Sequence, residues 1–183
     1  MSYRLHDVKI LVVEDMAPML ELTKSILNIF GFNKIVTASG GEQAFKLFQQ
    51  EKPDLVITDW LMEPVSGLDL IRMIRKDPAS PNPFVPIILM TGFSDRARVE
   101  LARDDGVTEF LVKPFSSKDI YSRIVQIIEK PRQFVQSTDF FGPDRRRRKI
   151  EEYPGPHRRI EDEALNNPND IILRDLQDEM KNV

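Results

Sequence analysis

Short apolar runs alternate with longer segments of helical periodicity from residue 9 to about residue 129. The apolar runs are rich in Val, Ile and Leu, which is typical of strands that are buried on both faces. The predicted strands span 9–13, 34–38, 55–58, 86–90 and 109–112, and the predicted helices span about 18–30, 41–50, 67–76, 94–105 and 117–129. Five strands that alternate with five helices predict right-handed crossovers, and therefore an α/β fold with a five-stranded, parallel, doubly wound sheet.

The pattern changes after Pro131, where the hydrophobic periodicity fades. Proline, arginine and acidic residues dominate 132–168, so this tail is predicted to be mostly irregular, because it has too little apolar surface to fold alone. Residues 169–183 are predicted to form a short helix or a mobile end, since four apolar residues of 170–180 share one helical face. The predicted organisation is a domain over 1–131, followed by these two segments.

Composition excludes several classes of protein. The sequence has no cysteine, which excludes disulfides, thiol nucleophiles and cysteine-ligated zinc, and its two histidines are too few for a His-rich metal site. No apolar run reaches about 18 residues, and the N-terminus lacks the apolar core of a signal peptide. We therefore expect a cytoplasmic protein with no membrane insertion. The formal net charge of −3 neither favours nor excludes a polyanionic partner.

Polar residues follow four of the predicted strands at the point where each strand ends. They are Glu14 and Asp15, Asp59, Thr91 and Gly92, and Lys113 and Pro114. In a parallel sheet these carboxyl ends meet at one edge, where ligands commonly bind. Clustered carboxylates with a lysine suit Mg²⁺ and a phosphoryl group, whereas a single such acid would more often cap a helix or form a surface ion pair.

Residues 9–129 resemble the receiver domain of two-component response regulators, in a layout closest to single-domain CheY-like proteins. The resemblance lies in the acidic pair Glu14–Asp15, in Asp59 followed by Trp60, in Gly67 eight residues after Asp59, in Thr91, and in Lys113–Pro114. It implies a flavodoxin-like fold in which Asp59 is the phosphoacceptor, assisted by Lys113 and Thr91. It also implies that the protein is not an enzyme beyond its own phosphorylation and dephosphorylation.

The same resemblance implies a Mg²⁺ site and a conformational switch. Asp15 and Asp59 would bind Mg²⁺ directly, Glu14 through water and Leu61 through its backbone carbonyl. Thr91 and Phe110 would be the switch pair, and the bond between Lys113 and Pro114 is a candidate cis peptide. The output face would lie on the fourth helix, the fifth strand and the fifth helix.

The chain departs from the family pattern around the acceptor. The family usually has proline after the Met that follows the acceptor, but here Glu63 takes that place and proline moves to Pro64, which leaves the loop path open. Leu61 and Phe93 occupy two flanking positions where polar residues often help water to reach the phosphoryl group. This apolar rim predicts slow self-dephosphorylation.

The tail contains a repeat of the form aromatic-x-Gly-Pro-x-Arg-Arg. Residues 140–146 match residues 153–159, and seven basic residues against three acids leave a charge of +4 between Phe140 and Ile160. A solvated basic run is one interpretation. The other is a ligand with two guanines and two phosphates, because arginine forks bind phosphate and the guanine edge while aromatic rings stack on purines. Cyclic di-GMP has that composition.

The tail also resembles the arginine-rich extension of the Cle group, CheY-like regulators that bind cyclic di-GMP and act on the flagellar motor and surface attachment. The candidate ligand residues are Arg145, Arg146, Arg147, Arg148, Arg158 and Arg159, with Phe141 and Tyr153 as stacking candidates. Expected partners are a sensor histidine kinase or phosphotransfer protein and a flagellar motor switch or other surface-machinery protein. No specific DNA binding is expected, because no helix-turn-helix motif follows.

Two alternatives remain at this stage. In the first, the protein is a phosphorylation-driven receiver of a two-component or chemotaxis relay, and its tail is a linker. In the second, the tail is a nonspecific nucleic-acid-binding arm, which predicts a steep salt dependence and little preference among guanine nucleotides.

Overall fold

The computed structural model describes residues 5–92, 96–136, 140–144 and 163–165. Its elements are a short 3-10 helix η1 (Leu5–Asp7), β1 (Lys9–Val13), α1 (Ala17–Ile29), β2 (Lys34–Ala38), α2 (Gly41–Glu51), β3 (Leu55–Asp59), α3 (Gly67–Lys76), β4 (Ile87–Thr91), α4 (Arg96–Asp104), β5 (Glu109–Val112), α5 (Ser117–Glu129), β6 (Phe134–Gln136), β7 (Phe141–Pro143) and β8 (Glu163–Leu165). The five predicted strands and five predicted helices are all present, with ends within two residues of the prediction.

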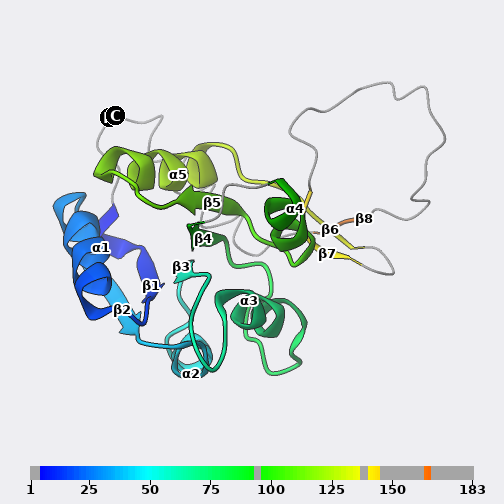
Figure 1. Cartoon of the computed structure of the whole chain (residues 1–183). Helices are drawn as coiled ribbons and strands as arrows, with labels where there is room; N and C mark the ends of the chain where they lie inside the picture. Colours follow the sequence, from blue (N-terminus) through cyan, green and yellow to red (C-terminus); the bar gives the residue numbers. More distant parts are fainter. Residues whose placement is uncertain (1–4, 93–95, 137–139, 145–162, 166–183) are drawn as a thin grey trace.

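The first five strands form one parallel sheet in the order β2-β1-β3-β4-β5 (Figure 1). Each strand except the two at the edges is therefore hydrogen-bonded on both sides, and β3 occupies the centre. Every residue of β3 and β4 is buried, as the uninterrupted apolar runs predicted. This confirms the predicted doubly wound α/β fold.

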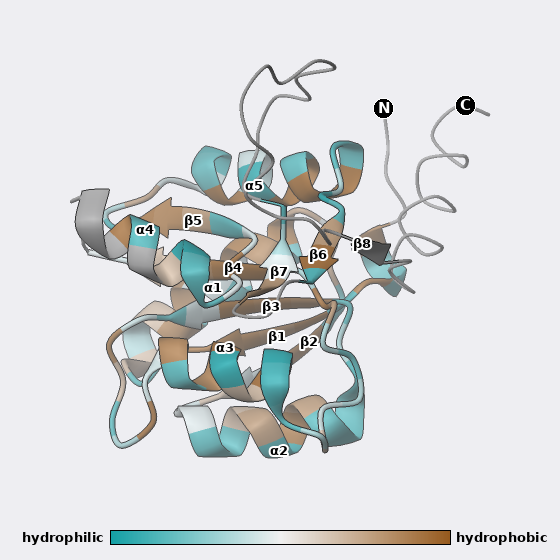
Figure 2. Cartoon of the chain, turned by 90° about the vertical axis from the view of Figure 1, so that its right-hand side faces the viewer, coloured by the Kyte–Doolittle hydropathy of each residue, from teal (hydrophilic) through white to brown (hydrophobic). Residues whose placement is uncertain are grey.

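Helices cover both faces of this sheet. Helices α1 and α5 lie on one face, where Leu27 and Ile124 pack with Ile10 and Ile57 of the strands. On the other face, α2 and α3 supply buried residues such as Phe48 and Ile71, and α4 supplies Ala102. Figure 2 shows the apolar strands as the layer between helices that carry their polar residues outward. The alternation of elements along the chain thus produces a three-layer domain.

Two helices begin with a reciprocal cap. Ser66 caps α3 and Ser116 caps α5: each serine side chain accepts a hydrogen bond from the backbone N–H three residues later, where an Asp side chain accepts from the backbone N–H of the cap residue. Beyond the other helix ends, Gly31 and Gly106 both adopt φ of +94°, a backbone conformation that favours glycine.

A second, smaller sheet of three antiparallel strands was not predicted. Its order is β7-β6-β8, so the central strand β6 pairs with β7 on one side and with β8 on the other. Phe134, Val135 and Phe140 are at most 5% exposed. Residues 134–136, 141–143 and 163–165 thus form strands within the tail that was predicted to be mostly irregular. The boundary at residue 131 stays a prediction, although packing against the domain continues beyond it.

The small sheet packs against the amino-terminal ends of β4 and β5. Phe84, which precedes β4, has its ring centre 5.3 Å from the centres of both Phe134 and Phe141. A Cβ atom added to Gly142 would lie 2.9 Å from the Cα atom of Gly106, which precedes β5. The predicted acidic site lies at the opposite end of the parallel sheet, where the strands have their carboxyl ends.

Candidate functional site

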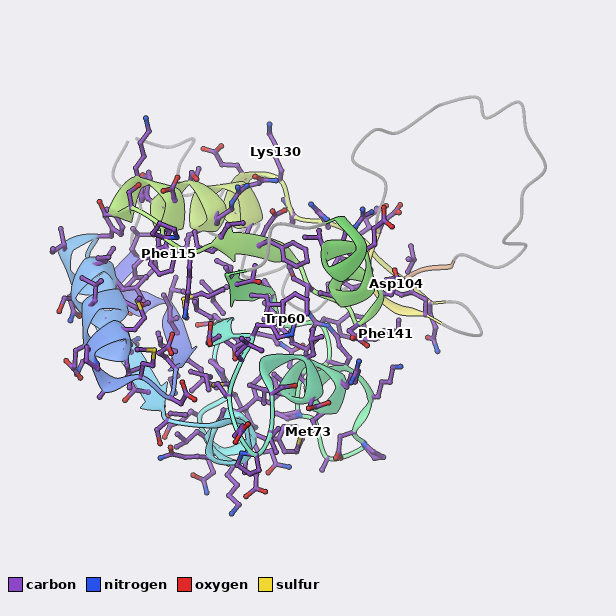
Figure 3. The ribbon with its side chains drawn as sticks, in the orientation of Figure 1. Trp60, Met73, Asp104, Phe115, Lys130 and Phe141 are labelled. Carbon is purple, nitrogen blue, oxygen red and sulfur yellow. The ribbon has the colours of Figure 1, made fainter. Side chains whose placement is uncertain are left out.

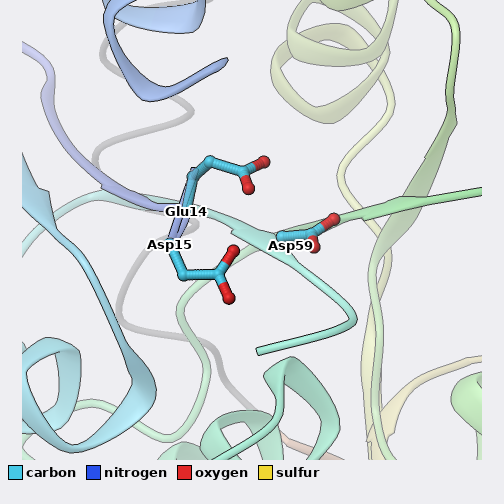
Figure 4. Close-up of side chains that lie close together, drawn as sticks. All are labelled: Glu14, Asp15 and Asp59. Carbon is cyan, nitrogen blue, oxygen red and sulfur yellow. The ribbon is translucent and has the colours of Figure 1, made fainter. Parts of the chain in front are cut away.

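Three carboxylates meet at the carboxyl end of the parallel sheet. Glu14 and Asp15 directly follow β1, and Asp59 is the last residue of β3, the neighbour of β1 in the sheet (Figure 4). One carboxylate oxygen from each residue lies within 4.8 Å of the others. The sequence prediction that these strand ends converge is confirmed.

The carboxylates differ in their exposure. Glu14 is fully buried and Asp59 is 7% exposed, while Asp15 is exposed. Buried carboxylates require a partner, because an isolated charge in a low-dielectric interior is strongly unfavourable. Lys113 supplies that partner: its Nζ lies 2.7 Å from Asp59 Oδ1 and 2.8 Å from Glu14 Oε2.

These contacts alter the protonation equilibria of two groups. Burial raises the pKa of Glu14, with a further increase from the Asp59 charge, and the hydrogen bond from Lys113 only partly opposes this. Burial by itself would lower the pKa of Lys113, but its hydrogen bonds to Asp59 and Glu14 raise it above 10.5 overall. Lys113 is therefore a permanent cation at neutral pH.

The residues present fit a hard divalent cation. All three acidic side chains offer oxygen atoms, and with Lys113 charged the four groups carry a formal charge of −2 when the acids are ionised. Mg²⁺ prefers oxygen ligands and keeps several waters, which the exposed side of Asp15 can accommodate. Receiver domains use Mg²⁺ at an acidic pocket of this kind, and Glu14, Asp15 and Asp59 would hold it here. The contribution of the Leu61 carbonyl stays a prediction.

Thr91 and Lys113 lie beside each other at the ends of β4 and β5. The backbone N–H of Lys113 donates to the carbonyl of Thr91 at 2.7 Å, and Thr91 is fully buried. Phe110 is half-buried and packs against the apolar cluster on the α2–α4 face. Thr91 and Phe110 are thus on neighbouring strands, and their role as a switch pair stays a prediction.

Two cis peptide bonds flank the site. The bond between Lys113 and Pro114 is cis, as predicted. The bond between Glu63 and Pro64, in the loop where the proline is displaced from the family position, is also cis. Leu61, two residues after Asp59, is 61% exposed, while Phe93 lies outside the described residues, so the apolar rim stays a prediction.

The structure describes one of the eight ligand residues predicted in the tail. Phe141 lies on β7, half-buried, with its ring centre 5.3 Å from that of Phe84 and 5.7 Å from that of Phe134. Figure 3 shows it on the opposite side of the domain from Phe115, which follows the Lys113–Pro114 bond. Its ring is therefore used at least partly in packing. Arg145, Arg146, Arg147, Arg148, Tyr153, Arg158 and Arg159 lie outside the described residues.

Sequence reasoning missed a second cluster of charged residues, at the amino end of β5. Glu109 is 3% exposed and accepts hydrogen bonds from Arg132 at 2.7 Å and from Gln126 at 3.1 Å. Arg75 of α3 is also buried. An acid at the start of an otherwise apolar strand was the signal for Glu109, whereas nothing in the sequence marks Arg75.

The chain is similar to known signalling proteins over the parallel-sheet domain. The family model described as the response regulator receiver domain matches residues 10–125. The chain is 31% identical over 124 residues to the chemotaxis protein CheY-3 of Vibrio cholerae, covering 68% of this chain and 94% of that protein. It is 37% identical over 122 residues to a probable transcriptional regulator, ycf27, of Guillardia theta, covering 67% of this chain. The match spans only 46% of that regulator's length.

Solved structures agree with this similarity. A response regulator receiver domain protein from Clostridium thermocellum superposes with a TM-score of 0.60 and 34% identity, covering 67% of this chain and 95% of that one. The chemotaxis protein CheY4 of Vibrio cholerae superposes with a TM-score of 0.61 over 66% of this chain and 98% of that one, and at 23% identity it supports the fold alone. Among the described residues, no helix is long and apolar enough to cross a membrane.

Proposed function

The chain belongs to the response regulator receiver family, and from its site we propose that Asp59 accepts a phosphoryl group and that this modification drives signalling through a protein partner. The observation that carries the proposal is the double contact of Lys113 with Asp59 and Glu14, with Asp15 on the open side. This arrangement holds an Asp59 oxygen next to the Lys113 ammonium group. It also places that oxygen among the carboxylates that could bind a divalent metal ion.

The chemistry follows from these groups. An Asp59 carboxylate oxygen attacks the phosphorus atom of the donor, and the bond from phosphorus to the donor breaks with its electron pair leaving on the donor. Where the donor is a phosphohistidine of a sensor kinase or phosphotransfer protein, that pair returns to the imidazole nitrogen. Lys113 and the Thr91 hydroxyl would stabilise the transferred oxygens, and Mg²⁺ would neutralise their charge.

Phosphorylation by a small donor tests this proposal. Incubation of the protein with Mg²⁺ and acetyl phosphate should increase its intact mass by one phosphoryl group, and Asp59→Asn should abolish the increase. Glu51→Gln is the matched control, because Glu51 is the last residue of α2 and pairs with Lys9 at the amino end of β1, the edge of the sheet opposite the pocket. Equal phosphorylation of Asp59→Asn and the wild type would refute Asp59 as the acceptor.

We propose further that the arginine-rich tail binds cyclic di-GMP. The support is the repeat itself, with its paired aromatic and arginine residues, together with the strand order β7-β6-β8. The chain leaves β7 after Pro143 and re-enters the sheet at Glu163 on the other side of β6. The sequence that carries the arginines therefore connects two strands of the same small sheet.

The position of Phe141 alters one detail of this proposal. Its contacts with Phe84 and Phe134 give the first repeat an anchoring function, so stacking on a base would rely more on Tyr153. The arginines Arg145, Arg146, Arg147, Arg148, Arg158 and Arg159 remain the proposed guanine and phosphate ligands.

Calorimetric titration distinguishes this ligand from a generic polyanion. Cyclic di-GMP should bind more tightly than GTP, and binding should disappear when Arg145–148 are replaced by alanine. The matched control replaces the same four residues by lysine, which keeps the charge but loses the bidentate fork. If the lysine variant binds as well as the wild type, with a steep dependence on salt, the tail is a nonspecific anion-binding arm instead.

The proposed partners follow from the relatives. A sensor histidine kinase or phosphotransfer protein would supply the phosphoryl group, and the CheY-type relatives make a flagellar motor switch or other surface machinery the proposed target. The alternative is a receiver driven by phosphorylation alone, with the tail as a linker. It predicts that Asp59→Asn abolishes partner binding while the arginine substitutions leave it intact.

A further inference from the structure

Strand β5 is held at both ends by ion pairs. At its carboxyl end, Lys113 Nζ lies 2.7 Å from Asp59 in the candidate phosphorylation site. At its amino end, Glu109 accepts a hydrogen bond at 2.7 Å from Arg132, which lies beyond α5. The strand comprises only Glu109–Val112, so about 13 Å of extended chain separates the two anchors.

The contact between Glu109 and Arg132 lies largely out of water. The Glu109 side chain is 3% exposed and that of Arg132 is 18% exposed. Gln126 of α5 donates to the same Glu109 oxygen at 3.1 Å, and Arg123 lies 3.9 Å from the other oxygen. A buried carboxylate with this many donors holds the segment that contains Arg132 much more firmly than a surface ion pair would.

A second contact fixes the same segment to α3. Arg75 is 4% exposed and donates two hydrogen bonds to the Gly106 carbonyl, at 3.0 and 3.1 Å, and one each to the carbonyls of Pro83 and Val85. Its guanidinium carbon lies 5.1 Å from the ring centre of Phe134. Arg75 therefore connects the turns before β4 and β5 to the first residue of β6.

We call residues 132–136 and 140–144 the latch. Besides the contacts of Arg132 and Phe134, the latch places Phe141 against Phe84 and Gly142 against Gly106. The latch thus contacts the amino ends of both β4 and β5, while their carboxyl ends carry Thr91 and lead to Lys113.

We propose that the latch is coupled through β5 to the phosphoryl pocket, so that a phosphoryl group on Asp59 changes how firmly the latch is held, and the latch in turn sets the pocket's affinity. This inference rests on the proposed function of Asp59. Strand β5 suits the role because it is an edge strand, hydrogen-bonded only to β4 in the parallel sheet, and is therefore less constrained than β3 or β4. The coupling must act equally in both directions.

Trp60 reports on the pocket without any label. It is the single tryptophan of the chain and directly follows Asp59. Its fluorescence during titration with beryllofluoride in the presence of Mg²⁺ should yield the affinity for this phosphoryl analogue. We expect Arg132→Ala and Glu109→Gln each to shift the half-saturating concentration at least threefold, and the double variant to shift it no further than the larger single effect. Lys130→Ala is the matched control, because it removes an exposed positive charge two residues from Arg132.

Hydrogen exchange on the wild-type protein tests the reverse direction and does not depend on a variant that folds. Mg²⁺ and beryllofluoride should change the protection of the β6 amides, at the far end of the domain. If the Trp60 titrations of all variants coincide and β6 exchange is unaffected, the latch is structural only and the coupling is refuted while the pocket proposal stands. If beryllofluoride leaves the Trp60 signal of the wild type unchanged, the pocket proposal fails and the coupling falls with it.

Discussion

Gly67 passes so close to Asp59 that a Cβ atom at position 67 would lie 2.0 Å from the Asp59 carbonyl oxygen. The same Cβ would lie 3.2 Å from the Cα atom of Trp60, and the Gly67 N–H donates to the Trp60 carbonyl at 2.9 Å. The loop between β3 and α3 therefore closes on the backbone of the acceptor itself. Only a residue without a side chain fits where α3 begins.

Gly67→Ala should consequently lower the free energy of unfolding by at least about 3 kcal/mol, since the obstructing atoms belong to the backbone and cannot rotate away. Urea unfolding followed by circular dichroism measures this loss. Gly40→Ala is the control, because nothing lies within 4 Å of a Cβ added there, and its cost should stay below about 1 kcal/mol. Equal costs for the two substitutions would contradict the close approach.

Lys113→Ala should change the binding of Mg²⁺ and of beryllofluoride in opposite directions. The substitution removes the cation that neutralises Asp59 and Glu14, so the pocket becomes more negative and should bind Mg²⁺ more tightly. The phosphoryl analogue loses a stabilising charge and should bind more weakly. Trp60 fluorescence follows both titrations. A parallel loss of both affinities would show instead that the pocket had collapsed around the unpaired Glu14.

Leu61→Asn should accelerate the loss of the phosphoryl group from Asp59. The side chain is 61% exposed next to the acceptor, where an amide can hold a water that leucine cannot. One added hydrogen bond of about 1.4 kcal/mol in the transition state corresponds to roughly a tenfold increase in rate. The decay of the phosphorylated mass after removal of the donor gives the rate. Ile29→Asn is the control, because it replaces an apolar residue by asparagine at an 82% exposed site at the end of α1. It should leave the rate of dephosphorylation unchanged.

Most of the parallel domain could be predicted from the sequence because its strands are buried on both faces. An apolar run such as that of β3 has few alternative structures, and its end at Asp59 was visible as a change from apolar to acidic residues. The convergence of Glu14, Asp59 and Lys113 then followed from the parallel topology, in which all strand ends meet at one edge. The cis bond before Pro114 followed from the family resemblance alone.

The small sheet could not be predicted for the opposite reason. Its described strands are three residues long. Phe134 and Phe141 pack against each other and against Phe84, which precedes them by some fifty residues in the sequence. A period of two cannot be recognised over so short a run, and the Gly142-Pro143 dipeptide within β7 is typical of a turn. The burial of Arg75 could not be predicted either, because a basic residue in the last turn of a helix normally faces solvent.

Arg75→Met should destabilise the domain by about 3 kcal/mol or more. Methionine can fill the space, but the carbonyls of Gly106, Pro83 and Val85 lose their donor, and each buried unsatisfied acceptor costs about 1 to 3 kcal/mol. Burial lowers the pKa of Arg75 to about 9, so the lost group is still a cation at neutral pH. Denaturant unfolding measures the effect.

Arg72→Met, one turn earlier on α3, is the control for this prediction. Arg72 pairs with Asp69 and Asp105 but is 45% exposed, so its loss should cost at most about 1 kcal/mol. A cost for Arg75→Met no larger than that of Arg72→Met would mean that water replaces the lost donors, and that Arg75 does not hold the turns before β4 and β5.

The cap of α3 predicts a pH-dependent stability. The Ser66 hydroxyl bonds to Asp69 and lowers the pKa of that carboxyl below 3.8, with a smaller contribution from Arg72. Because the folded pKa is lower than the unfolded one, the stabilisation is fully present above about 3.8 and is lost as the pH falls through the folded pKa. Ser66→Ala should therefore cost about 1 kcal/mol at neutral pH, and this difference from the wild type should shrink at pH values below 3.8. Urea unfolding at both pH values measures the difference.

Ser122→Ala is the control, because Ser122 is an exposed serine inside α5, and its small effect on stability should not change with pH. If the cost of Ser66→Ala also stayed the same at both pH values, the ionised Asp69 would be excluded as the partner that makes the cap stabilising.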